Sequence, residues 1–288
     1  MSGTRAPRRV TLFTHREVTD TADAVAQLLR RAAAAGVELI VPSGEADKHG
    51  IEPGDGVRVS DDPTTETDLA LVLGGDSTIL TALRAHAGSD VPVFAINFGA
   101  IGFLAAVDRD ELDQGLDRAL AGDYSTLAMP ALAVPTPDGT RRAAADVSFH
   151  RRPDARVAEL SYSVEGEQLG KVRCDGLVAA TPVGSTGYNL ANGGPLLAWG
   201  VEGFVVSFIA PHSLTARAVV VAPDTALTVF NCSDRDAVDV TTDGRTVCEL
   251  EPLAELAVRF EHEGVTLAQI PGVGFYARLR EKFGRIAY

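Results

Sequence analysis

The clearest structural signal in the sequence is Leu69-Ala70-Leu71-Val72-Leu73-Gly74-Gly75-Asp76-Ser77-Thr78. Its five leading apolar residues are typical of a strand that is buried on both faces. Two glycines follow at once, and the pattern from Ser77 to His86 is helical. A buried strand that turns through glycines into a helix predicts a parallel sheet flanked by helices.

The same alternation continues on both sides of this stretch. We expect ligands of such a sheet to gather at the carboxyl ends of its strands. The pattern predicts strands at 10–14, 37–41, 69–73 and 91–96, helices at 21–35, 77–86 and 108–121, and an acidic loop at 45–67.

Beyond residue 121 the pattern changes to one that is rich in strands. The sequence therefore predicts an α/β domain at 1–121, completed by the closing segment 262–288, and a β-rich domain at 122–261. The further elements expected are strands at 127–134, 142–149, 157–164, 177–181, 203–209, 226–230, 237–241, 255–260 and 265–270, and a helix at 275–282.

Composition excludes several classes of protein. With 26 basic and 39 acidic residues the net charge is −13, which argues against non-specific binding of nucleic acid. Three scattered cysteines predict neither a disulfide framework nor a zinc site, and the six histidines have no metal-ligand spacing, so no protein metal cage is expected. No signal peptide or membrane helix is indicated, which favours a cytoplasmic protein.

The turn Gly74-Gly75-Asp76 has the residue types of a phosphate site. Backbone N–H groups at the start of a helix can receive phosphate oxygens, and glycines permit a close approach. The Asp76 carboxylate could accept a proton from a hydroxyl group or position a divalent metal. The motif alone equally allows a tight turn in which Asp76 only caps the helix.

Two later stretches repeat the combination of glycines and polar residues. Residues 97–104 (NFGAIGFL) follow the next expected strand, although taken alone they are more often a structural turn whose Phe103 plugs the core. Residues 173–195 (RCDGLVAATPVGSTGYNLANGGP) suit a nucleotide pocket, where Asp175 can accept from an exocyclic amine and Tyr188 offers a stacking face. The alternative for this second stretch is a hairpin with a glycine-rich turn.

Taken in order, these motifs resemble those of the NAD kinase family, which phosphorylates the adenosine 2′-hydroxyl of NAD using ATP or polyphosphate. The resemblance spans most of the chain and rests on residues 74–76, 97–104, 175–195, 211–212 and 242–245. The long signature at 175–195 is highly specific, whereas Gly-Gly-Asp is shared with diacylglycerol kinases and phosphofructokinases.

The resemblance implies a two-domain architecture and a role for each matching residue. Asp76 would be the base, and a divalent metal, Mg²⁺ or Mn²⁺, would accompany the ATP or polyphosphate donor in a cytoplasmic homodimer or homotetramer. The phosphates would face Gly74, Gly75, Ser77 and Thr78. NAD would be held by Asp76, Ser77, Asn97, Phe103, Asp146, Arg173, Asp175, Thr186, Gly187, Tyr188, Asn189, Ala191 and Arg245.

Two positions depart from the family pattern and keep other interpretations open. Ser77 stands where the family usually has glycine, and Ala145, before Asp146, stands where it usually has asparagine. These departures motivate a second hypothesis, a catalytically weak sensor that binds NADP(H). A third is a Gly-Gly-Asp kinase with a lipid or sugar acceptor, against which the polar segment 175–195 counts.

Overall fold

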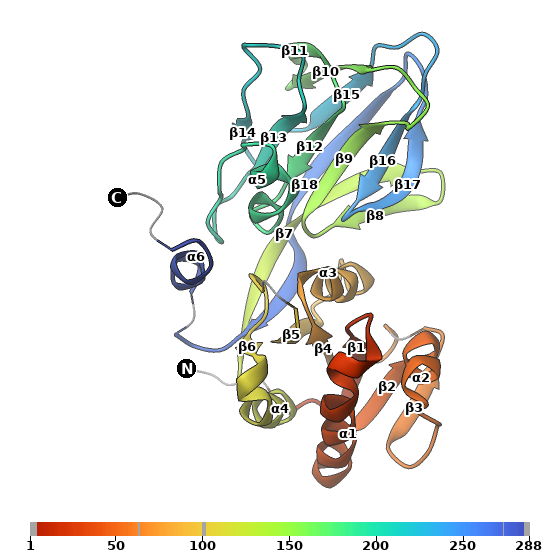
Figure 1. The fold of residues 1–288 in the computed structure, drawn as a ribbon, viewed down its shortest axis with the longest axis vertical. Helices are drawn as coiled ribbons and strands as arrows, with labels where there is room; N and C mark the ends of the chain where they lie inside the picture. Colours follow the sequence, from red (N-terminus) through yellow and green to blue (C-terminus); the bar gives the residue numbers. More distant parts are fainter. Residues whose placement is uncertain (1–4, 63, 100–101, 273, 285–288) are drawn as a thin grey trace. The chain divides into compact units, whose positions relative to one another are not determined.

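The computed structural model describes residues 5–62, 64–99, 102–272 and 274–284, and the chain forms two compact units (Figure 1). Unit 1 comprises Met1–Ala128 and Val265–Tyr288, and unit 2 comprises Met129–Gly264. The division falls seven and three residues later than the boundaries expected after residues 121 and 261. Two long strands, β7 (Ser125–Thr136) and β18 (Glu255–Gln269), run through the points of division.

Unit 1 is a parallel sheet with helices on both faces. Its strands follow the order β18-β5-β4-β1-β2-β3, and every pairing with a described register is parallel. Its elements are β1 (Arg9–Thr14), α1 (Val18–Ala35), β2 (Glu38–Pro42), α2 (Ser43–His49), β3 (Val57–Ser60), β4 (Leu69–Gly74), α3 (Asp76–Ala85), β5 (Pro92–Asn97), β6 (Val107–Asp108), η1 (Arg109–Glu111), α4 (Leu112–Ala121) and α6 (Phe275–Phe283).

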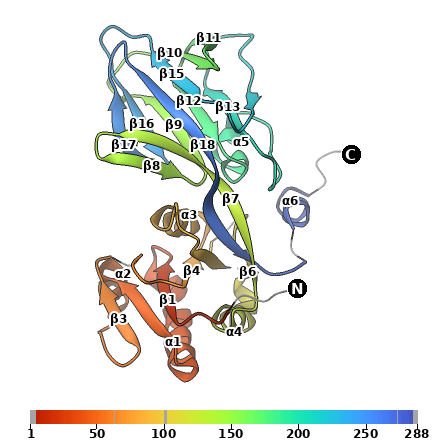
Figure 2. The same cartoon turned by 180° about the vertical axis from the view of Figure 1, so that it is seen from behind.

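The direction of the connections changes between β1 and β4, which are neighbours in the sheet. From β1 the chain moves outward to β2, whereas from β4 it moves the opposite way to β5. Helix α3 consequently lies on one face of the sheet, and α1 and α4 lie on the other (Figures 1 and 2). A sheet of this kind offers its ligand crevice at such a switch point, beyond the carboxyl ends of the strands. Gly74 is the last residue of β4, and Gly75 and Asp76 follow its carboxyl end.

The prediction that 45–67 is an acidic loop is wrong, because this segment contains most of α2 and all of β3. Helix α2 buries only Ala46, so its sequence carries no apolar periodicity that would reveal it. Strand β3 lies at the edge of the sheet with no fully buried residue, so its own sequence does not identify it as a strand. Its parallel pairing with β2 makes it one.

Unit 2 is built from two β-sheets that enclose one apolar core. A six-stranded antiparallel sheet has the order β14-β13-β12-β9-β16-β17, and the facing strands β11, β10, β15 and β18 are joined by β7 and β8. Its further elements are β8 (Gly139–Ala143), β9 (Asp146–Arg151), β10 (Ala158–Val164), β11 (Glu167–Cys174), β12 (Gly176–Ala180), η2 (Gly184–Thr186), α5 (Tyr188–Ala191), β13 (Phe204–Ile209), β14 (Val219–Val221), β15 (Leu227–Asn231), β16 (Val238–Thr242) and β17 (Arg245–Leu250).

The strand pattern of unit 2 differs from expectation in three ways. The strand expected at 142–149 is two strands, β8 and β9, separated at Ala144 and Ala145. The strands expected at 255–260 and 265–270 are one strand, β18. Its Gly264 reads as a break in the sequence, yet a Cβ there would lie 2.1 Å from that of Ala131, so glycine permits close packing inside a continuous strand. The strands β11, β14 and β17 were not expected at all.

Candidate functional site

The Gly-Gly-Asp turn of unit 1 is packed against the turn that follows the neighbouring strand β5. A Cβ on Gly75 would lie 3.1 Å from the Cα of Gly99, and a Cβ on Gly99 would lie 2.9 Å from the Cα of Gly75. A Cβ on Gly74 would lie 2.6 Å from Oγ1 of Thr78. These glycines therefore allow two backbone turns to touch at the carboxyl edge of the sheet.

The Asp76 carboxylate is bound by the backbone of the segment that follows β5. Phe103 N–H donates to both carboxylate oxygens, at 3.0 and 3.1 Å, and Leu104 N–H donates to Oδ1 at 3.2 Å. Gly75, not Asp76, occupies the N-cap position of α3, and no side chain caps this helix. The alternative in which Asp76 only caps the helix is therefore wrong, since its carboxylate fixes a different part of the chain.

Opposing effects act on the pKa of Asp76. Burial is the largest and raises it above the ordinary value for aspartate. The hydrogen bonds from Phe103 and Leu104 and the positive charges of Arg278 and Lys282 in α6 lower it, without cancelling the effect of burial. The result is a half-buried carboxylate that is pre-oriented and more basic than a solvent-exposed aspartate.

The sequence-based interpretation missed Arg278, which lies far along the chain in α6. Its side chain is buried, and its Nη1 donates to the carbonyl oxygens of Phe103, at 3.3 Å, and Ala105. Nη2 donates to Oε1 of Gln269 at 2.9 Å. A signal was present, because an arginine at the apolar spacing of a closing helix must find polar partners, but the sequence does not say which ones.

Other predicted residues of unit 1 have different surroundings. Ser77 is exposed in the first turn of α3, where its side chain does not fill the Gly-Gly turn. Asn97 braces its own loop, because Oδ1 accepts from Gly99 N–H at 3.0 Å and Nδ2 donates to Asp108 Oδ1 at 3.1 Å. The Phe103 ring is buried and packs against Phe275, while the Phe103 N–H group faces the Asp76 carboxylate. Ala100 and Ile101 of the same motif lie outside the described residues.

In unit 2, Asp243 organises the start of strand β9. Its carboxylate accepts N–H bonds from Ala144 at 3.0 Å, Ala145 at 2.7 Å and Asp146 at 3.2 Å. The Ala145 carbonyl oxygen in turn accepts from Thr181 N–H at 2.9 Å. A Cβ on Gly184 would lie 2.1 Å from that oxygen, so only glycine fits there.

Asp146 lies beside Asp243, and its pKa is raised to about 7 by burial and by the negative charge of this neighbour. The Tyr188 pKa is raised by burial and by the charges of Asp146 and Asp175. One face of the Tyr188 ring stacks on His150, with ring centroids 5.6 Å apart and planes at 10°. The structure thus brings together Asp146, Tyr188 and Asp175, and it adds His150, which sequence reasoning had not selected for this site.

The loop between β12 and β13 is held by its own polar side chains. Asn189 is fully buried, and its Nδ2 donates to the carbonyl oxygens of Ser185 at 3.1 Å and Pro195 at 2.9 Å. Ser185 Oγ accepts from Leu197 N–H at 2.9 Å. Asn189 thereby stabilises the loop, and its assignment to NAD stays a prediction. Thr186 is half-buried, whereas Gly187 and Ala191 are exposed on the same loop.

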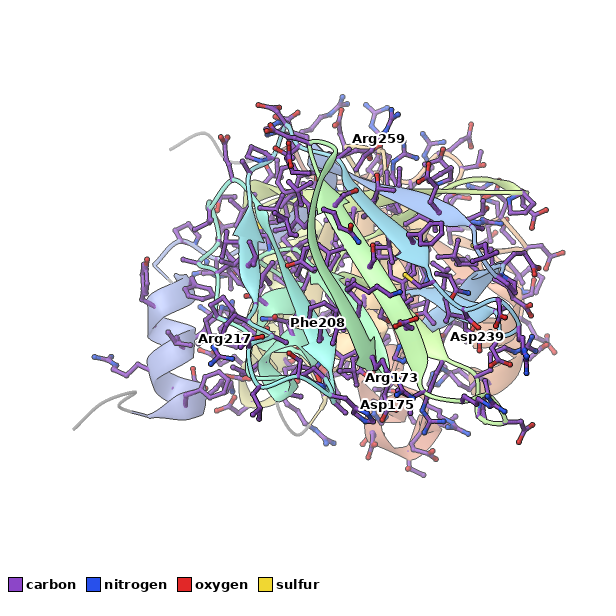
Figure 3. All side chains as sticks on the ribbon, turned by 90° about the horizontal axis from the view of Figure 1, so that it is seen from above. Arg173, Asp175, Phe208, Arg217, Asp239 and Arg259 are labelled. Carbon is purple, nitrogen blue, oxygen red and sulfur yellow. The ribbon has the colours of Figure 1, made fainter. Side chains whose placement is uncertain are left out.

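Arg173 and Asp175 lie next to each other at the end of β11 (Figure 3). Arg173 is exposed, while Asp175 forms an ion pair with Arg151, with Nε and Oδ1 2.6 Å apart. Arg151 was not selected from the sequence, and it occupies one of the oxygens with which Asp175 was expected to accept an amine. Arg245 is exposed at the first position of β17, after the turn that carries Asp243.

Within the described ranges, no group of three or more His, Cys, Asp or Glu residues lies close enough to hold a metal ion. In the same part of the chain, no helix is long and apolar enough to cross a membrane.

Comparisons with known proteins agree with these features. Residues 10–124 match the ATP-NAD kinase N-terminal domain family, and residues 144–269 match the ATP-NAD kinase C-terminal domain family. The chain is 35% identical over 236 residues to an NAD kinase of Gemmatimonas aurantiaca, covering 80% of this chain and 81% of that one. It is 36% identical over 227 residues to an NAD kinase of Ralstonia nicotianae, covering 77% and 75% respectively.

Two solved structures share the fold. A yeast NADH kinase complexed with NADH superposes with a TM-score of 0.86 at 22% identity, over 99% of this chain and 90% of that one. An NAD kinase from Archaeoglobus fulgidus in complex with ATP gives 0.72 at 22% identity, over 96% and 97%. The family matches cover most of both units, and the relatives share more than a third of the aligned residues. The chain therefore belongs to the NAD kinase family.

Proposed function

We propose that this chain transfers the terminal phosphoryl group of ATP to the adenosine 2′-hydroxyl of NAD and so forms NADP. The observation that carries the proposal is the Asp76 carboxylate, which is held by two backbone N–H groups at the switch point of the parallel sheet. Membership of the NAD kinase family supports the choice of acceptor and donor.

In this proposal Asp76 takes the proton of the 2′-hydroxyl while that oxygen attacks the γ-phosphorus of ATP. The bond from the γ-phosphorus to the bridging oxygen breaks, and ADP leaves. The raised pKa of Asp76 suits a base, because a more basic carboxylate accepts the proton more readily. The Ser77 N–H group, in the first turn of α3, would receive a donor phosphate oxygen, whereas the Thr78 N–H group already donates to the Gly75 carbonyl oxygen at 2.9 Å.

We assign NAD binding to the polar residues of unit 2. Asp146 would accept from a hydroxyl or amide of the dinucleotide, and Tyr188 would stack on a ring with the face that His150 does not cover. Arg173 and Arg245 are both exposed, and each would serve a phosphate oxygen. Asp175 would contribute through the oxygen that Arg151 leaves open.

The metal of the reaction, Mg²⁺ or Mn²⁺, would be carried by the donor phosphates. The described residues include no cluster of three or more metal-ligating side chains, which fits an ion held chiefly by phosphate and water. When bound, the ion would neutralise charge on the transferring phosphoryl group. Polyphosphate is the alternative donor, because the turn at Gly74 and Gly75 selects for phosphate and not for a base.

The sensor hypothesis rests on Ser77 and Ala145. The exposed position of Ser77 counts against it, since this side chain does not narrow the turn. Ala145 supports the sensor hypothesis only in part. Its side chain offers no amide, but its backbone keeps the hydrogen bonds to Asp243 and Thr181. We further propose a cytoplasmic location and a homodimer or homotetramer, as the family resemblance implies.

NADP formation by the purified protein tests the proposal. NAD or NADH is supplied as acceptor, ATP or polyphosphate as donor, and Mg²⁺ is either present or removed by a chelator. We expect NADP from NAD and ATP, and loss of product on chelation. Measured NAD binding without phosphoryl transfer from any donor would contradict the proposal and favour the sensor.

A further inference from the structure

The segment Phe103–Ala105 is held from two sides by hydrogen bonds. On one side, the N–H groups of Phe103 and Leu104 point to the Asp76 carboxylate, at 3.0 to 3.2 Å. On the other side, the carbonyl oxygens of Phe103 and Ala105 accept from Arg278, and that of Leu104 accepts from Gln269 Nε2 at 3.3 Å. This short segment therefore links α6 to the carboxylate that we propose as the base.

Arg278 and Gln269 form one buried unit. The guanidinium donates to Gln269 Oε1 at 2.9 Å, and the two residues are only 5% and 6% exposed. A guanidinium carries its donors in a rigid planar fork, which allows it to hold two carbonyl oxygens and an amide oxygen together. Burying such a charge is costly, so its retention in this position calls for a role beyond filling space.

Arg278 also acts on Asp76 through its charge. The positive charges that face Asp76 are Arg278 and Lys282, both in α6, and both lower the pKa of the carboxyl group. The carboxylates that face Arg278 are Asp76, Asp108 at the end of β6, and Glu281 in α6. Lys282 is paired with Glu281, with Nζ and Oε1 2.8 Å apart, so Arg278 is the buried cation of this group.

We propose that Arg278 is a positioning residue for phosphoryl transfer, because it fixes the segment 103–105 whose N–H groups hold the Asp76 carboxylate. Gln269 assists by holding the middle carbonyl of the same segment. This inference rests on the proposed function, since it assumes that Asp76 is the base.

The test compares kcat, the KM for NAD and the pH profile of kcat among four variants of the full chain. Arg278→Met removes the donors and the charge, and Arg278→Lys keeps the charge but loses the fork. Gln269→Met removes one donor and keeps the charge. Arg280→Met, an exposed arginine in the same helix, is the matched control.

We expect Arg278→Met to lower kcat about 100-fold, since a small misplacement of a catalytic group has effects of this size, with little change in KM. The acidic limb of the kcat–pH profile should move to higher pH in this variant, because the pKa of Asp76 rises when a neighbouring positive charge is lost. Arg278→Lys keeps the positive charge, so it should return the acidic limb to its wild-type pH and recover part of kcat. Gln269→Met should lower kcat about tenfold, a smaller misplacement of the same group, without moving the limb.

A merely structural role predicts something else. The variants would then lose thermal stability, while kcat per folded molecule and the acidic limb would match those of Arg280→Met, and the inference would be overturned. If Arg278→Met does not fold, an unchanged kcat in Gln269→Met overturns it equally. A wild-type protein that forms no NADP contradicts the proposed function itself, whereas an active wild type that is indifferent to Arg278 contradicts only this inference.

Discussion

One aspartate in each unit, Asp76 in unit 1 and Asp146 in unit 2, has a pKa that burial raises, and neighbours of opposite charge surround the two. In unit 1, Asp76 accepts hydrogen bonds from the backbone and lies near the cations Arg278 and Lys282. In unit 2, Asp146 lies beside another carboxylate, Asp243, with no cation among the main influences on its pKa. Burial raises both pKa values, but only in unit 1 do neighbouring charges oppose it.

The difference teaches how one residue type can serve two purposes in one protein. For an aspartate whose burial is opposed by cations and N–H donors, these neighbours favour the ionised form, which can accept a proton. An aspartate whose burial is reinforced by a second carboxylate titrates near neutral pH, where it can donate a hydrogen bond as well as accept one. We therefore expect Asp76 to govern turnover and Asp146 to make dinucleotide binding depend on pH.

The largest effect on stability is expected from Asp243, which maintains the acidic surroundings of Asp146. Asp243→Ala removes the acceptor of three backbone N–H groups and places alanine at a φ of 47°, where alanine is strained. We expect a loss of about 3 kcal/mol in the free energy of unfolding, measured by urea denaturation.

Asp243→Asn is the matched control, because asparagine tolerates the left-handed backbone and keeps one carbonyl oxygen. It should cost about half as much, and it should also lower the pKa of Asp146 by removing the neighbouring charge. Equal losses in both variants would show that the carboxylate charge, which both variants remove, and not the backbone conformation decides stability at this turn.

Asp146→Asn should stabilise the protein increasingly as the pH rises. The native pKa of about 7 lies above the ordinary value of 3.8, so the native state binds more protons than the unfolded state between these pH values. Stability from this carboxyl group is therefore present at low pH and is lost as the pH rises through about 7. The gain from Asp146→Asn should grow by about 2 kcal/mol between pH 5.5 and 8.5.

Urea denaturation at the two pH values measures this gain, with the exposed Asp138→Asn as control. A gain that does not change with pH would mean that Asp146 does not titrate in the native state over this range. The proposed difference between Asp76 and Asp146 would then be wrong for Asp146.

The smallest effect is expected from His150, which covers one face of Tyr188. His150→Ala removes a stacked pair worth about 1 kcal/mol and leaves Tyr188 less well oriented. We expect the Kd for NAD to rise about fivefold in calorimetric titration, with kcat nearly unchanged. His150→Phe keeps a stacking ring and should bind NAD as the wild type does; if it binds as weakly as His150→Ala, stacking is not what His150 contributes.

The local pattern of the sequence was sufficient to predict the parts of the fold and site that depend on neighbouring residues. The turn at Gly74–Asp76 was predictable because a buried strand, two glycines and a helix follow one another directly. The edge strands β3 and β11 were not, since their sequences are largely polar and pairing with a neighbouring strand makes them regular. The short helix α2 was not predictable either, because it buries only Ala46.

Contacts between side chains far apart in the sequence were the second feature that the sequence could not predict. Arg278 and Arg151 could not be assigned to Asp76 and Asp175 from the sequence, because tertiary folding alone brings these side chains near one another. The role of Asn189 within its own loop was missed for the same reason, because only the folded loop brings its Nδ2 to the carbonyl oxygens of Ser185 and Pro195. The assignment of Asn189 to NAD stays a prediction.

The most direct test of the account is the rate of NADP formation by Asp76→Asn with NAD and ATP both saturating, alongside the Kd for NAD. Asparagine has the same shape and can still accept from Phe103 and Leu104, but it cannot take a proton. We expect kcat to fall at least about 1000-fold while the Kd for NAD changes less than about threefold. A variant that turns over at the wild-type rate would show that Asp76 is not the base and would contradict the central claim.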